Sequence, residues 1–210
     1  MWRVGALAFL CQNLTEADSE PGHRFNYASY VINLLPGVVE QAYGLPAIDV
    51  LEDRIYRRLG AEADGWFNTD PVGTLVAEGH ISLTLRDFAR WALLLLHGGR
   101  NLEGEQVLPG WWATETVRPR QALIDAFARG DYADAFPGAQ YHNKAWVLEP
   151  GRTMAMLGIH GQFCLLDLQA QLLVVAYASY PAQVDEVMIA STLVFWEAVR
   201  EAVSVSGGRT

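Results

Sequence analysis

Three apolar segments of strand length follow one another near the C-terminal end of the chain, over residues 154–159, 163–168 and 172–179. Residues 167–170 (DLQA) can turn between the second and third segments, so we expect the three strands to form an antiparallel meander. Residues 172–176 (LLVVA) are apolar without alternation, which predicts that both faces of that strand are covered by other parts of the chain.

Apolar residues at helical spacing lie on both sides of this predicted sheet. After it, residues 185–203 carry an apolar face around Trp196, and this helix should cover the sheet. Before it, Thr84 and Asp87 form a capping-box pattern that begins a helix, which Gly98 ends. Further helices are expected over residues 1–11, 48–59 and 109–117, with an irregular connection over 118–144.

An antiparallel sheet closed by a C-terminal helix, with a separate group of helices, is an α+β arrangement. Gly and Pro are scattered, and no repeat or linker divides the chain. We therefore expect one domain over residues 1–210.

Composition narrows the classes of partner. The chain has 15 Lys and Arg against 24 Asp and Glu, a net charge of −9, which argues against nucleic-acid binding because phosphates require a basic surface. No segment reaches the roughly 18 apolar residues of a membrane span. The apolar start is too short for a signal peptide, and we interpret it as a buried helix. A cytoplasmic protein that acts on a small molecule is expected.

Cysteine and histidine spacing gives no sign of a metal or cofactor. Cys11 and Cys164 are far apart, and we expect two buried thiols rather than a bridge. No glycine-rich phosphate loop is present. The five histidines lack the paired spacing of metal ligands, and they are His23, His80, His97, His142 and His160.

Two short stretches carry side chains suited to chemistry. In residues 21–29 (PGHRFNYAS), Tyr27 lies on a loop at a helix entrance, with the hydroxyl of Ser29 two residues on. In residues 158–162 (GIHGQ), His160 follows a strand. Each stretch alone has a plain structural interpretation: Ser29 as an N-cap, Tyr27 as a packed aromatic residue, and His160 as a satisfied residue of a tight turn.

The order of these stretches and the motifs between them changes that interpretation. The intervening motifs are residues 59–62 (LGAE), the pattern GxxSxTxRDxAR over 79–90, and VLPxxW over 107–112. Together they resemble the class C β-lactamase-like, penicillin-recognising serine hydrolases, and most closely the aminohexanoate-dimer (nylon-oligomer) hydrolase branch. The resemblance covers about residues 20 to 200 and implies the C-terminal part of a β-lactamase/transpeptidase-like fold.

In that family a serine of a Ser-x-x-Lys motif attacks an amide or ester carbonyl, and a tyrosine moves the proton. The resemblance implies that Tyr27 is this tyrosine, with Ser29 in the place of the usual asparagine. Residues 158–160 replace the family's Lys-Thr-Gly strand, so the backbone N–H of Ile159 would stabilise the oxyanion. His160 replaces the usual lysine, which favours amidase or esterase activity over β-lactamase activity.

The same resemblance implies a substrate pocket. His160 would be the polar group that faces the substrate, beside Gly158, and Trp146 would line the pocket. A small linear amide or ester is the expected substrate, and no metal or cofactor is needed.

The chain departs from the family at the nucleophile. Lys144 is the only lysine, and the residue three before it is Tyr141, so no Ser-x-x-Lys motif is present. We therefore expect residues 1–210 to be a truncated domain that lacks the preceding segment. Loss of that segment should expose an apolar patch and a strand edge, through which the chain could self-associate.

Three hypotheses stay open at this point. The chain is part of an amidase or esterase, or it is a non-catalytic ligand-binding pseudoenzyme, or it is an inert fragment of a gene. An in-frame Ser-x-x-Lys motif in the DNA upstream of Met1 would favour the first hypothesis.

Overall fold

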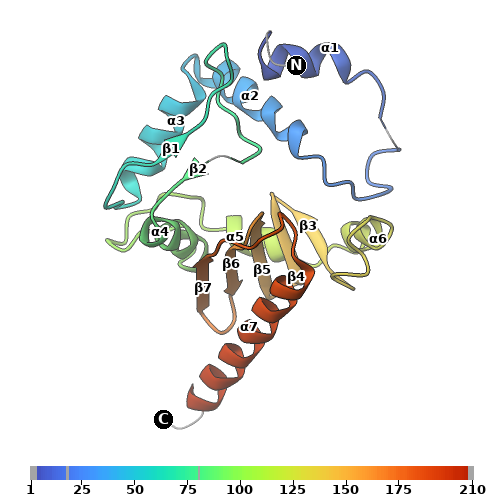
Figure 1. Cartoon of the computed structure of the whole chain (residues 1–210). Coiled ribbons are helices and arrows are strands. Elements are labelled where there is room, and N and C mark those ends of the chain that lie inside the picture. The colour runs from blue at the N-terminus through green and yellow to red at the C-terminus, as the bar shows by residue number, and fades with distance from the viewer. Residues whose placement is uncertain (1–3, 18, 80, 208–210) are drawn as a thin grey trace.

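A five-stranded antiparallel sheet forms the centre of the structure (Figure 1). The structure is a computed structural model, and it describes residues 4–17, 19–79 and 81–207. The strands follow the order of the chain, and they are β3 (Gln140–His142), β4 (Ala145–Glu149), β5 (Thr153–Gly158), β6 (Gln162–Asp167) and β7 (Leu172–Tyr177). The predicted meander is confirmed as its last three strands.

The predicted irregular connection over 118–144 is partly wrong. It contains helix α6 (Gln121–Ala128) and strand β3, which forms a hairpin with β4. The turn between these two strands is Asn143-Lys144, with φ angles of +50° and +65°. Left-handed backbone at both positions is typical of a tight hairpin turn, but a lysine there gives a weak signal in the sequence.

Helices cover both faces of the sheet. On one face, α4 (Leu85–Leu96) and α5 (Trp112–Val117) pack on a core that includes Val147 and Cys164. On the other face lies α7 (Glu186–Gly207), whose Trp196 is 1% exposed and packs against Leu165. Figure 1 shows α7 crossing the sheet. The expected α+β fold with a C-terminal helix on the sheet is confirmed.

Strand β7 is covered on both faces, as the absence of alternation predicts. Leu173 and Val175 pack against the core beneath α4, whereas Leu172 and Val174 pack against the core beneath α7. The strand is also the last of its sheet, so one of its edges has no partner strand within the described residues.

A buried charge network ties α7 to the sheet. The Asp167 carboxylate, on β6, is fully buried and accepts a hydrogen bond from Arg152 Nε at 2.7 Å. Arg200 of α7 lies 3.2 Å from the same carboxylate and also pairs with Glu149 of β4. Each buried charge is thus compensated by a partner, as its loss of hydration requires.

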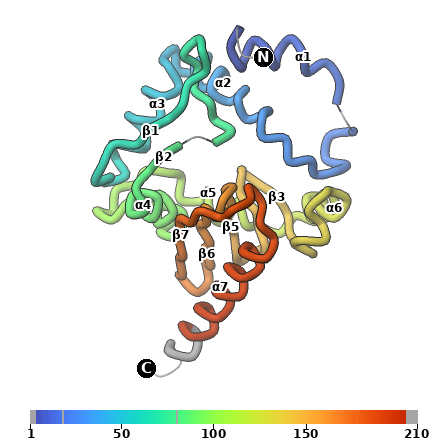
Figure 2. Tube along the Cα trace, in the orientation of Figure 1, coloured from blue at the N-terminus to red at the C-terminus, as the bar shows by residue number. Residues whose placement is uncertain are grey.

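A smaller group of elements precedes the sheet in the chain and lies above it in Figure 2. It consists of α1 (Ala6–Asn13), a 3-10 helix (Ser29–Asn33), α2 (Leu34–Tyr43), α3 (Ala47–Arg54), a 3-10 turn (Tyr56–Arg58) and a two-stranded sheet of β1 (Trp66–Phe67) and β2 (Ile81–Ser82). No helix of the described residues is long and apolar enough to cross a membrane.

Several helix predictions differ from the structure in detail. The helix expected over 48–59 ends at Arg54, because the backbone leaves the helical region at Ile55. The helix expected over 109–117 begins at Trp112. Thr84 does cap α4, and its Oγ1 accepts a hydrogen bond from Asp87 N at 3.1 Å.

The N-terminal prediction is only partly confirmed. Ala6 and Leu10 of α1 are buried, and residues 1–3 lie outside the described residues. Cys11 is exposed, so the expectation of two buried thiols is wrong for this residue and right for Cys164. The two cysteines are not bridged.

Candidate active site

The two stretches singled out in the sequence lie at the same end of the large sheet. In an antiparallel meander, alternate turns lie at the same end, so the β3–β4 turn at Lys144 and the β5–β6 turn at residues 159–161 are neighbours. The loop that carries Tyr27 packs on the first of these hairpins. Residues 27 and 160, which are far apart in the sequence, are therefore placed at the same end of the sheet.

Tyr27 is held by a cluster of aromatic rings. Its ring stacks on Trp146, with centroids 5.3 Å apart and planes inclined by 22°. Three more rings contact it at steeper angles, from Phe25, Tyr132 and Tyr141. Ring contacts of this kind each contribute about 0.5–1.5 kcal/mol beyond burial, so the orientation of Tyr27 is well determined.

Trp146 lies at the base of this aromatic cluster and is not an exposed residue of a pocket wall. Its side chain is 5% exposed, and it is paired across the sheet with Tyr141 of β3 and Ala155 of β5. The structure thus places Trp146 beneath Tyr27. Direct contact between Trp146 and a substrate stays a prediction.

The surroundings of Tyr27 are poorly hydrated. Burial, with a smaller effect from the neighbouring Tyr27, raises the pKa of the Tyr141 hydroxyl well above its usual range. Lys144 Nζ lies 5.6 Å from the centre of the Tyr27 ring. Burial lowers the pKa of this lysine, and the carboxylate of Glu78 partly opposes that effect.

Tyr141 and Lys144 were not predicted as site residues. In the sequence, Lys144 stands out only as a possible partner of a serine nucleophile, and residues 118–144 were expected to be irregular. The available signal was Asn143-Lys144 directly before the apolar residues 145–148, which permits a hairpin.

Ser29 begins the 3-10 helix of residues 29–33 and is half-buried. The capping position of this helix is Ala28, and no side chain caps it by a hydrogen bond. The interpretation of Ser29 as an N-cap is therefore wrong. A role for Ser29 in the proton pathway stays a prediction.

The β5–β6 turn presents Ile159 and His160 at the end of the sheet. Gly158 pairs with Gln162 as the last pair of the two strands, and the Ile159 side chain is 57% exposed. No described residue accepts a hydrogen bond from the Ile159 N–H. That group can therefore donate to an oxyanion, whereas the N–H of His160 already donates to Gln183 O at 3.0 Å.

His160 is fixed by the segment that follows β7. Its Nδ1 lies 2.9 Å from the Tyr180 carbonyl oxygen, and its own carbonyl accepts a hydrogen bond from Tyr180 N at 3.0 Å. The tyrosine is in turn held by α7, since its hydroxyl lies 2.9 Å from Thr192 Oγ1. In the part of the chain that is described, no group of three His, Cys, Asp or Glu residues could hold a metal ion.

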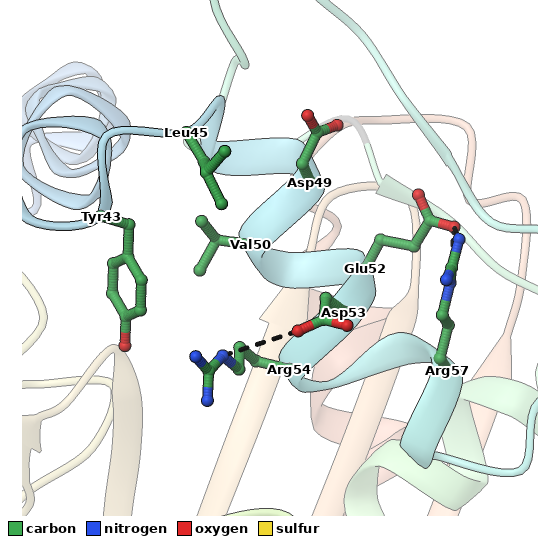
Figure 3. A pocket seen from close by; sticks show the side chains of 8 residues that line it. All are labelled: Tyr43, Leu45, Asp49, Val50, Glu52, Asp53, Arg54 and Arg57. Atoms are coloured by element: carbon green, nitrogen blue, oxygen red, sulfur yellow. Dashed lines mark hydrogen bonds and ion pairs between the residues drawn. The ribbon is translucent and has the colours of Figure 1, made fainter.

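A separate hollow of about 330 Å³ lies on α2 and α3 (Figure 3). Its charged side chains are mostly paired with each other, such as Arg57 with Glu52 at 2.8 Å and Arg54 with Asp53 at 3.6 Å. These pairs are exposed and contribute little energy. None of the predicted site residues lines this hollow, which is formed by Tyr43, Leu45, Asp49, Val50, Glu52, Asp53, Arg54 and Arg57.

Comparisons with known proteins agree with the family resemblance that the motifs indicate. The chain is 31% identical over 161 residues to a 6-aminohexanoate-dimer hydrolase of Paenarthrobacter ureafaciens, a match that covers 75% of this chain and 40% of the relative. A solved structure from Bacillus anthracis, named for the same activity, has a TM-score of 0.76 at 21% identity and covers 89% of this chain and 46% of that one.

A further solved structure, from Bacteroides dorei and named as a β-lactamase, has a TM-score of 0.66 at 19% identity. It covers 82% of this chain and 56% of that one. These two structural likenesses show the fold. The chain thus spans less than half the length of the Paenarthrobacter and Bacillus proteins.

The family assignment rests on a longer match than any of these motifs. The sequence matches the Beta-lactamase family over residues 9–194, which include the Tyr27 loop, the capped helix α4 and the β5–β6 turn. The resemblance inferred from the motifs is confirmed, and the chain belongs to the Beta-lactamase family.

Proposed function

We propose that this chain supplies the tyrosine and the oxyanion-binding part of a serine hydrolase site for small linear amides or esters. The proposal is supported by the stacking of Tyr27 on Trp146 of the β3–β4 hairpin, and by the Ile159 N–H, which donates to no described residue, in the β5–β6 turn at the same end of the sheet. A serine of a Ser-x-x-Lys motif, contributed by a segment outside this sequence, would supply the nucleophile.

In the proposed reaction the serine hydroxyl attacks the substrate carbonyl carbon. Tyr27 relays the proton: its oxygen accepts the serine hydroxyl proton as its own phenolic proton passes to the leaving amine or alcohol, while the Ile159 N–H donates to the carbonyl oxygen as it becomes negative. Water then releases the acyl group from the serine. His160 and Gly158 lie beside the oxyanion donor, where they would contact the substrate.

By itself the chain should not form an acyl-enzyme, because a tyrosine and an oxyanion donor lack a nucleophile. Incubation with a fluorophosphonate probe, followed by intact-mass measurement, tests this expectation. Addition of one probe mass to a serine would show that the chain carries its own nucleophile. A protein extended by the Ser-x-x-Lys segment that binds an amide but is still not labelled would favour the second candidate, a ligand-binding pseudoenzyme.

Tyr27→Phe tests the assigned role directly, in a protein extended by the Ser-x-x-Lys segment. The change removes only the hydroxyl, and general acid–base groups contribute about 10²–10⁴-fold to rate. We expect turnover of an amide to fall by about this factor, with a smaller fall for an ester because an amine leaving group depends more on its proton.

Tyr132→Phe is the matched control, since its ring also contacts Tyr27 edge-on with centroids 6.0 Å apart. It should leave turnover nearly unchanged. If Tyr27→Phe keeps near-normal amide turnover, or if its loss only follows a loss of thermal stability, Tyr27 is a packing residue.

Self-association is part of the same proposal. Val187 and Val194 are seven residues apart on one face of α7 and are 74% and 70% exposed. Phe195 beside them is 57% exposed, and β7 has an edge without a partner strand among the described residues. Such surfaces favour association. Analytical ultracentrifugation should show oligomers that Val194→Glu weakens.

A cytoplasmic location also belongs to the proposal, and fractionation of cells that express the chain would test it. We do not expect the chain to bind nucleic acid, because its net charge is −9.

A further inference from the structure

His160 carries its proton on a known ring nitrogen. The Tyr180 carbonyl oxygen, 2.9 Å from Nδ1, can only accept a hydrogen bond, so Nδ1 must donate. In the neutral ring the other nitrogen, Nε2, then has a lone pair and no hydrogen. Nε2 is therefore a hydrogen-bond acceptor.

The surrounding hydrogen bonds hold the His160 ring with Nδ1 toward the Tyr180 carbonyl oxygen. The backbone of His160 is bonded on both sides, through its N–H to Gln183 and through its carbonyl to Tyr180. Tyr180 cannot move away easily, because its ring lies against Gly161 and its hydroxyl lies 2.9 Å from Thr192 Oγ1. A flipped ring would place the Cδ2–H group against the Tyr180 carbonyl oxygen, and the other tautomer would place the Nδ1 lone pair there, so either change would lose this hydrogen bond.

Nε2 has no hydrogen-bond partner among the described residues, so it is available to a ligand at this end of the sheet. The His160 side chain is half-buried, and no described residue forms a hydrogen bond with Nε2. Trp146, which supports Tyr27, pairs with Ala155, three residues before the end of β5. At a rise of roughly 3.3 Å per residue, the turn that carries His160 begins about 10 Å farther along the strand from this pair.

Resting on the proposed hydrolase function, we propose that His160 makes the site select ligands that present an N–H group, so that secondary amides bind in preference to the corresponding esters. An amide N–H can donate to Nε2. The ester oxygen at the same position has no hydrogen and would face the Nε2 lone pair, at the cost of an unpaired acceptor. A lysine at this position would do the opposite, because an ammonium group only donates.

The test uses two neutral probes of the same shape, N-methylhexanamide and methyl hexanoate, which differ only by an N–H in place of an oxygen. Both probes are uncharged, so neither forms an ion pair with the ammonium of Lys144. Binding to the chain is measured by NMR titration at pH 8, where an ordinary imidazole is neutral. We expect the amide to bind about threefold to tenfold more tightly, the usual net effect of one hydrogen bond.

His160→Asn is the decisive variant. Asparagine tolerates the left-handed backbone found at this position, φ +57°, and its side-chain N–H₂ can replace Nδ1 as the donor to Tyr180. It has no group in the place of Nε2. The preference for the amide should disappear while the fold is kept. His97→Asn, at the exposed C-terminal end of α4, is the control and should keep the preference.

Three outcomes seen with the unmodified chain would overturn the inference. They are equal binding of the two probes to the unmodified chain, binding of neither probe, and long-range ¹H–¹⁵N spectra that place the His160 proton on Nε2. A preference that persists in a folded His160→Asn variant would also overturn it. The Tyr27→Phe test does not depend on any of these results, so failure of the selectivity and failure of the proposed hydrolase function are distinguishable.

Discussion

Gly161→Ala introduces a methyl group where the β5–β6 turn meets the Tyr180 ring. The backbone φ of Gly161 is +86°, in the left-handed region that favours glycine. A Cβ atom built there would lie 2.7 Å and 2.8 Å from two carbons of the Tyr180 ring and 2.9 Å from the Ala178 Cβ. These distances are shorter than carbon atoms tolerate, so the ring or the turn must move.

The magnitude follows from three contributions. A left-handed backbone costs an alanine about 1–2 kcal/mol. Overpacking costs about 1–3 kcal/mol, and the ring cannot relax freely because its hydroxyl is tied to Thr192. Alanine also restricts the unfolded chain, which offsets about 0.4–1 kcal/mol. We expect the free energy of unfolding to fall by about 2–4 kcal/mol.

Gly138→Ala separates the backbone cost from the overpacking cost. Gly138 has φ +78°, and no heavy atom lies within 4 Å of a Cβ built there. Its substitution should cost about 1 kcal/mol or less.

The assay is equilibrium unfolding in urea, where the midpoint should shift and the slope should stay the same. If Gly161→Ala costs no more than Gly138→Ala, the close approach of Tyr180 does not explain the glycine. A Tyr180→Ala change should recover part of the loss in the Gly161→Ala background, because it removes the ring.

Two further predictions concern pH and thiol chemistry. Burial raises the pKa of the Asp70 and Asp87 carboxyls, but other interactions outweigh it and hold both pKa values below the usual range. Backbone N–H groups donate hydrogen bonds to both carboxyls, and the Thr84 hydroxyl and the Arg90 charge also lower the pKa of Asp87. The stability that these two carboxylates contribute is therefore complete above the unfolded pKa of about 4 and is lost as the pH falls through the lower folded pKa. Asp87→Asn should make the thermal unfolding temperature fall less steeply as the pH is lowered through this range. Cys11 is exposed, whereas Cys164 is buried and burial raises its thiol pKa. Ellman's reagent should therefore modify Cys11 quickly in the native chain and Cys164 only in denaturant. Fast modification of both native thiols would contradict the buried position of Cys164.

Local patterns in the sequence predicted the elements whose causes are local. The apolar segments at 154–179 became β5, β6 and β7, and the Thr84 and Asp87 pattern became the capped start of α4. Residues within four positions of each other decide both kinds of feature, through alternation, helical spacing and capping hydrogen bonds.

The β3–β4 hairpin could not be predicted in the same way. Strand β3 has only three residues, and it is extended because it pairs with β4 and because the buried Gln140 side chain bonds to the backbone near residues 118–120. The backbone groups that bond to Gln140 lie 20 and 22 residues before it, so no short window of sequence contains this part of the cause.

The candidate site shows the same division between sequence and structure. The sequence alone determined that a tyrosine is followed by a turn with a histidine, and that no Ser-x-x-Lys motif is present. These are properties of residue type and spacing. The tertiary structure decided that Trp146 and Tyr141 orient Tyr27, and that the Tyr180 carbonyl leaves His160 Nε2 as an acceptor. The orientation of a side chain and the place of its proton depend on the atoms packed around it, and packing is fixed only when distant segments fold together.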